Sequence, residues 1–281
     1  MSAPAKLLGF AALLALVFGV ATVAGGSVGP DRADDAAKRA DTPAGHGGDE
    51  PEAGHGGESE GGHEADAIRG LAVADDGLRL QLDSTSLPRG RAATLSFTID
   101  GPEGPVRDFE VEHEKRMHLI VVRRDGTGFQ HLHPELAADG TWSTPITLPE
   151  AGAYRVFADF KTAENETLAA DLTVDGDADY EALPERSDVD TTDGYRVELA
   201  ASDGKLGFTI TRDGQPVETE PYLGAGGHLV ALREGDLAYL HVHPVDGGGV
   251  EFETELDPDS RYRLYLQFQH EGEVHTAEFT R

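Results

Sequence analysis

The chain has 281 residues, a length typical of about two domains. Its 52 acidic and 23 basic residues give a formal net charge of -29, so nucleic acid and anionic lipid headgroups should repel it, and we expect no nucleic-acid partner. The absence of cysteine excludes disulfides, thiolate metal sites, thiol catalysis and a lipid-modified cysteine anchor.

Residues 1–30 contain an apolar run that follows Lys6 and covers residues 7–24. Its length is at the lower end for a membrane-spanning helix and long for a signal peptide. Residues 22–24 fit the small-residue cleavage rule poorly, so we favour an uncleaved anchor helix over a cleaved signal. Since Lys6 precedes the run and acidic residues follow it, the sequence predicts a single N-terminal span in the cell membrane with extracytoplasmic domains. The protein is secreted if the run is cleaved.

Residues 31–69 are rich in Asp, Glu, Gly and Ala, with His46, His55 and His63 in short Gly/His repeats. Such a composition cannot bury an apolar face, and it predicts a disordered acidic linker. Two roles for this linker stay open. It is either a spacer alone or a spacer that also captures metal ions weakly through its imidazoles and carboxylates.

From about Gly70 onward the pattern becomes that of β-strands. Residues 78–82 and 93–99 alternate apolar and polar side chains, and turns such as Asp100-Gly101 separate the segments. No segment has a helical period. Short strands at this density predict an all-β fold, namely an immunoglobulin-like antiparallel β-sandwich over residues 70–176.

The same plan then repeats. Residues 177–193 are acidic, contain Pro184 and predict a linker. Residues 262–268 repeat the pattern of residues 154–160, so the duplication covers a whole domain and predicts a second tandem β-sandwich over residues 194–281. Three histidines recur 110 positions later, which gives the candidate metal ligands as His118, His131 and His133 in the first copy and His228, His241 and His243 in the second.

Strand geometry predicts that the three histidines of each copy converge. A hairpin that turns at Asp125-Gly126 pairs residue i with about 252 − i, which sets His118 level with positions 133–134. His131 and His133 are two apart and share a face. In a chain without cysteine, three imidazoles suit copper(II), zinc or nickel, and we expect a copper ion with zinc as the second choice.

Further ligands stay open. Met117 offers a thioether that would favour copper(I), although strand alternation points its side chain to the opposite face, toward the core. Each of the following residues is a candidate fourth ligand: His113, Asp159, Gln267, His270 and His275.

The segment 117–134 with its His-Leu-His-Pro end, together with the strand at 154–160, resembles a class of exported, often actinobacterial, heavy-metal-binding or hypothetical secreted proteins. More broadly it is similar to YtkA-like and CopC-like β-sandwiches. The resemblance covers both domains and implies export, metal handling and a membrane metal transporter as partner. The chain departs from CopC proteins because their N-terminal histidine ligand has no equivalent here.

The sequence therefore predicts an exported, membrane-anchored protein that binds or delivers copper, with one histidine cluster in each domain. The alternative is a non-catalytic cell-surface interaction module whose histidines are structural, and a lesser alternative is a copper-dependent redox enzyme. The chain has no Gly-x-Ser-x-Gly elbow, His-Glu-x-x-His helix motif or phosphate loop, so we expect no catalytic residues.

Overall fold

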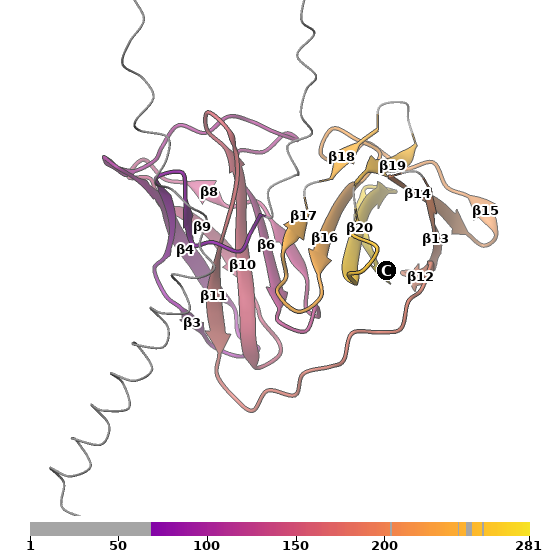
Figure 1. Cartoon of the computed structure of the whole chain (residues 1–281), viewed down its shortest axis with the longest axis horizontal. Coiled ribbons are helices and arrows are strands. Elements are labelled where there is room, and N and C mark those ends of the chain that lie inside the picture. The colour runs from indigo at the N-terminus through magenta and orange to yellow at the C-terminus, as the bar shows by residue number, and fades with distance from the viewer. Residues whose placement is uncertain (1–68, 203, 241, 246–248, 255) are drawn as a thin grey trace, which may run out of the picture. The chain divides into compact units, whose positions relative to one another are not determined.

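Every regular element that the computed structural model describes is a β-strand (Figure 1). The apolar helix and the acidic linker expected within residues 1–68 lie outside the described residues. Within the described part of the chain, no helix is long and apolar enough to span a bilayer. All of these residues belong to the unit Gly62–Arg281, and their ranges are 69–202, 204–240, 242–245, 249–254 and 256–281.

The first sandwich consists of two sheets. One has the order β1-β2-β4-β9-β8, with β5 paired to β4, and its strands are β1 (Ala74–Asp75), β2 (Leu78–Leu82), β4 (Ala93–Gly101), β5 (Gly104–Pro105), β8 (Glu135–Leu136) and β9 (Trp142–Ile146). The other has the order β3-β11-β10-β6-β7, and its strands are β3 (Ser86–Leu87), β6 (His118–Arg123), β7 (Gln130–Leu132), β10 (Gly152–Lys161) and β11 (Asn165–Val174).

The second sandwich repeats this strand order, except that its described residues form no counterpart of β3. One sheet has the order β12-β13-β14-β19-β18, with β15 paired to β14, and its strands are β12 (Val189–Thr192), β13 (Tyr195–Ser202), β14 (Lys205–Arg212), β15 (Gln215–Pro216), β18 (His243–Pro244) and β19 (Val250–Glu253). The other has the order β17-β16-β20-β21, and its strands are β16 (His228–Arg233), β17 (Tyr239–Leu240), β20 (Tyr262–His270) and β21 (Glu273–Thr280).

Two tandem immunoglobulin-like sandwiches are therefore present, as the alternating pattern predicted. In β4, alternate residues Leu95, Phe97 and Ile99 are buried in the first core, while the residues between them are more exposed. One difference concerns β12, which falls inside the segment assigned to the linker. It is a short strand without clear alternation, and its pairing with β13 is what defines it.

Strand β6 is buried along its whole length. Leu119 and Val121 point into the first core, whereas Ile120 and Val122 point away from it into a second apolar cluster. Side chains alternate between the two faces of a strand, so burial on both faces requires a layer on each side of the sheet. The second sandwich supplies the outer layer.

Strand β16 mirrors this arrangement. Leu229 and Ala231 belong to the core of the second sandwich, and Val230 and Leu232 join the cluster that β6 enters from the other side. We call this the inter-sandwich cluster, and its buried members are Ile120, Val122, Phe157, Ala169, Val230, Leu232, Leu237, Tyr239 and Tyr265. Equivalent faces of the two copies thus pack against each other.

Tyr265 makes the most specific contact between the sandwiches. Its ring stacks on that of Phe129 with a centroid separation of 4.1 Å, and its hydroxyl donates to the carbonyl oxygen of Gly126 at 2.6 Å. The stacked rings belong to β20 of the second sandwich and to the β6–β7 hairpin of the first. This contact fixes the hairpin against the second sandwich.

Replacement of Tyr265 by Phe should keep the stacked ring but leave the Gly126 carbonyl buried without its donor. We expect the free energy of unfolding to fall by about 1–3 kcal/mol, the typical cost of an unsatisfied buried acceptor. Urea denaturation followed by circular dichroism measures the change. Tyr222→Phe, which removes a hydroxyl outside this contact, is the control, and equal effects in the two variants would contradict the expectation.

Candidate metal centre

The β6–β7 hairpin carries three of the predicted ligands. It is antiparallel, as predicted, with a register that differs from the expected one by a single position, since Ile120 pairs with His131. If this register is continued by two positions from the pair of Ile120 and His131, His118 lies level with His133. Directly opposed residues of antiparallel strands share a face, so His118, His131 and His133 lie on the face of Ile120.

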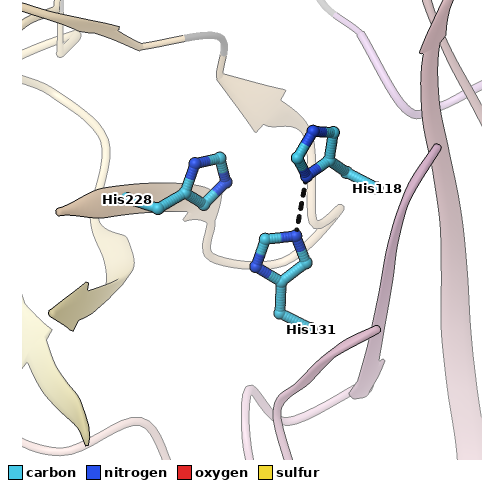
Figure 2. A group of neighbouring side chains, drawn as sticks. All are labelled: His118, His131 and His228. Atoms are coloured by element: carbon cyan, nitrogen blue, oxygen red, sulfur yellow. Dashed lines mark hydrogen bonds between the residues drawn. The ribbon is translucent and has the colours of Figure 1, made fainter. Parts of the chain in front are cut away.

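That face is the one that packs on the second sandwich. His228, the first residue of β16, shares a face with Val230, which points back toward β6. Ring nitrogens of His118, His131 and His228 lie within 4.8 Å of one another, and Figure 2 shows the three rings converging from opposite sides. We call these residues the interfacial triad.

This arrangement differs from the prediction of one cluster in each domain. The sequence placed His118 and His131 on the two paired strands of one hairpin, but it gave no sign that the two histidine-bearing faces would meet. Of the remaining second-copy ligands, His241 lies outside the described residues, and for His243 only the backbone, in β18, is described.

The shortest separation in the triad joins His118 Nδ1 to His131 Nε2, at 3.0 Å (Figure 2). Two cis ligands bonded to one metal ion at 2.0–2.1 Å are about 3 Å apart, so this pair already has the required spacing. Trans ligands are separated by about 4.2 Å, which is within the 4.8 Å that bounds the separations among the three ring nitrogens.

His133 lies beside the triad. Its ring centroid is 4.7 Å from that of His131 and 5.2 Å from that of His118. The Nε2 atoms of His133 and His228 are both buried, and neither has a hydrogen-bond partner among the described residues. A buried nitrogen without a partner costs free energy, so these two Nε2 atoms are available to bind a further group.

The outer nitrogens of two rings contact fixed acceptors. His118 Nε2 lies 3.2 Å from the carbonyl oxygen of Glu112, and His131 Nδ1 lies 2.6 Å from Oε1 of Gln267. Both oxygens can only accept, so each of these ring nitrogens carries the hydrogen and donates it. In the neutral rings, His118 Nδ1 and His131 Nε2 therefore hold lone pairs, and these lone pairs face each other.

The surroundings keep the imidazoles neutral. Burial, together with the neighbouring rings of His118 and His133, lowers the pKa of His131 to about 3. Burial and the nearby His118 lower the pKa of His133 to about 4, and burial also lowers the pKa values of His118 and His228. Neutral imidazole is the form that binds metals.

Gln267 has a role that the sequence did not reveal. It was a candidate ligand because it aligns with Asp159, but its amide oxygen accepts from His131 while its amide nitrogen donates to Thr276 Oγ1 at 3.3 Å. The residue therefore orients the His131 ring. A close backbone approach at Gly227 helps to position it, because a Cβ there would lie 2.9 Å from the Gln267 carbonyl oxygen.

Met117 and Asp159 are not part of the triad. The Met117 side chain is buried in the first core, so the alternative in which it binds metal is wrong and the strand-alternation argument is confirmed. Asp159 pairs with His118 across β10 and β6, but its Oδ1 accepts from Thr167 Oγ1 at 2.8 Å.

The two remaining histidines of the second copy lie in another environment. His270 Nδ1 is 2.8 Å from the Tyr195 hydroxyl, and His275 Nδ1 donates to Asp193 Oδ2 at 2.9 Å. Both are hydrogen-bonded at the edge of the second core, so neither supplies a fourth ligand to the triad.

Comparison with known proteins gives a family match and distant structural similarities. The family described as Domain of unknown function (DUF8832) matches residues 72–177 and 190–281. Comparison with curated proteins gave no match.

Among solved structures, Salmonella alpha-2-macroglobulin reacted with methylamine is 15% identical, with a TM-score of 0.28 and coverage of 76% of this chain and 15% of that one. The Escherichia coli adhesin FdeC is 14% identical over 74% of this chain and 65% of that chain, with a TM-score of 0.26. The Ig1-2 module of the Drosophila receptor protein tyrosine phosphatase DLAR is 7% identical over 72% and 96%, with a TM-score of 0.21. The chain thus spans a small part of the macroglobulin, and similarities this distant indicate no function.

The depressed pKa of His131 makes the metal-free protein sensitive to acid. In the unfolded chain this histidine titrates near 6.5. The contribution of His131 to the free energy of unfolding is therefore complete above that pH and is lost as the pH falls toward about 3. At pH 5.0 the loss for His131 alone should be about 2 kcal/mol relative to pH 7.5. Urea denaturation of chelator-treated protein at both pH values measures this loss. Between the same two pH values, the free energy of unfolding of His131→Gln should fall by about 2 kcal/mol less than that of the parent. An equal drop in the variant would contradict the assignment.

Proposed function

The chain belongs to the DUF8832 family, a domain of unknown function, and we propose that it is an exported protein that binds one copper ion between its two sandwiches. The ligands are His118, His131 and His228, and the His133 ring lies beside them, 4.7 Å from that of His131. The protein binds or delivers this ion, and the proposal includes no catalytic step.

One observation carries the proposal. His118 Nδ1 and His131 Nε2 are 3.0 Å apart, and each ring has its hydrogen fixed on the opposite nitrogen by an oxygen that can only accept. Two facing lone pairs repel each other unless a cation lies between them. A shared proton is disfavoured near neutral pH because burial lowers the pKa values of both rings. A metal ion satisfies both nitrogens.

The donor set favours copper(II), with zinc second. The ligands are all imidazole nitrogens, and for such sites copper(II) has the highest affinity among the divalent first-row metals. Met117 is in the core, so no thioether adds a preference for copper(I). His133 Nε2, buried and without a partner among the described residues, supplies a further nitrogen for a four-coordinate site.

Export and anchoring are part of the proposal. The apolar run at residues 7–24 behind Lys6 supports a membrane anchor, with both sandwiches outside the cytoplasm or secreted. The resemblance to YtkA-like and CopC-like sandwiches supports metal handling there. A membrane metal transporter is the partner that such a protein would serve.

Copper titration of the full chain tests the proposal. The titration should be done with His46, His55 and His63 replaced by alanine, so that weak binding by these histidines does not contribute. We expect one tightly bound copper(II) per chain, measured by competition with a chromophoric chelator. His131→Ala or His228→Ala should each lower the affinity by more than about a hundredfold, because each removes a direct ligand.

His270→Ala is the matched control, since His270 is hydrogen-bonded to Tyr195 away from the triad. The copper(II) affinity of this variant should equal that of the parent. If His228→Ala retains the parental affinity, the site is not interfacial and the proposal fails. If no variant changes the binding, the histidines are structural and the interaction-module hypothesis is favoured.

Gln267→Leu should weaken copper binding by about tenfold or more, the usual effect of removing the group that orients a metal-binding histidine. Gln267→Glu keeps an oxygen acceptor for His131 Nδ1–H and should restore most of the affinity. The same competition assay measures both variants, and their melting temperatures show whether the fold is intact. Equal losses in the two variants would mean that the Gln267 oxygen does not orient His131.

A further inference from the structure

A tight turn places a fifth imidazole at the edge of the cluster. Glu112 and Lys115 exchange backbone hydrogen bonds of 2.8 and 2.9 Å, and the two residues between them are His113, with φ of 45°, and Glu114, with φ of 66°. Two left-handed residues in a two-residue loop form the type I′ turn, which favours Asn or Gly because other residues are strained there.

The second sandwich builds the equivalent turn from different residues. Tyr222 and Ala225 make the same paired hydrogen bonds, with Leu223 at φ of 55° and Gly224 at φ of 81° between them. Leu223 is buried. The turn therefore needs no histidine, and in the first copy a histidine and a glutamate occupy positions for which leucine and glycine suffice.

His113 contacts the triad from its side. Its ring centroid is 6.1 Å from that of His118 and 6.1 Å from that of His228. His113 is only half-buried, whereas His118 is 3% exposed. The same turn presents the Glu112 carbonyl that fixes the hydrogen on His118. The turn thus orients one ligand and brings an additional imidazole beside two others.

We propose that His113 is the exchange ligand of this site, the residue through which the metal ion enters and leaves the triad. This inference rests on the proposed function. A cation held by buried imidazoles must change its ligands stepwise. A bond to His113 forms as the bond to His131 Nε2 breaks, and the ion keeps its charge and oxidation state throughout. An external nitrogen or sulfur acceptor then bonds to the ion at His113 as its bonds to His118 and His228 break, and the bond to His113 breaks last.

The net charge of the whole chain favours the approach of a cation to this turn. Glu114 is exposed beside His113, and Glu110 and Glu112 lie on the same segment, where Lys161 is 3.5 and 3.7 Å from their carboxylates. Lys115, Arg116 and Lys161 balance these three acids, so the turn itself is close to neutral, whereas the whole chain carries -29 charges. A negative surface raises the local concentration of cations and speeds their encounter with a site.

The test is the rate of copper(II) transfer from the loaded full chain, without the histidines at 46, 55 and 63, to 4-(2-pyridylazo)resorcinol in a stopped-flow instrument. His113→Leu gives the first turn the side chain that the second copy uses, so the turn should persist. We expect the transfer rate to fall by about tenfold or more while the affinity for copper(II) stays within about threefold of the parent.

Glu114→Asp is the matched control, because it changes the same turn but keeps the imidazole and the negative charge, and its transfer rate should equal that of the parent. An unchanged rate in His113→Leu would overturn the inference. So would an affinity loss as large as that of His228→Ala, since His113 would then be a resident ligand. If copper binding by the parent does not depend on His228, the proposed function itself fails, and this inference fails with it.

Discussion

The structure depends on the packing of two equivalent strands against each other. β6 and β16 are the histidine-bearing strands of the two copies, and each is buried on both faces, with one face in its own core and the other in the inter-sandwich cluster. A strand covered on one side would leave its outer apolar side chains in water, at a cost of about 25 cal/mol for each Å². Their mutual burial also brings His118 and His228 together.

Within that contact, hydrogen bonds to the outer ring nitrogens decide the chemistry. A buried neutral histidine has one donor and one acceptor nitrogen, and its partners select which is which. The Glu112 carbonyl and the Gln267 amide oxygen both select the outer nitrogen as donor, which turns two lone pairs inward. The partner of His131 comes from the second sandwich. The two copies therefore share the histidine cluster and also the group that orients His131.

The duplicated positions have diverged in ways that suit a single shared site. Gln267 in the second copy orients a histidine of the first, whereas its counterpart Asp159 accepts from a threonine of its own sheet. Gly227 permits a close backbone approach where the first copy has the core residue Met117. A symmetric pair of sites would need the same residue in both copies at each of these positions. The two copies differ at both positions.

The amino-acid sequence alone determined the all-β fold, the duplication and the hairpin that sets His118 level with His133, because alternation, turn residues and strand parity are local properties. It also placed Met117 in the core by the same parity. It could not show that His228 would meet His118 and His131, since a continuous apolar run such as 119–122 indicates burial on both faces without identifying what covers the outer one. The roles of Gln267 and of the Glu112 carbonyl were likewise decided by tertiary structure, because a hydrogen bond between residues 136 positions apart leaves no pattern along the chain.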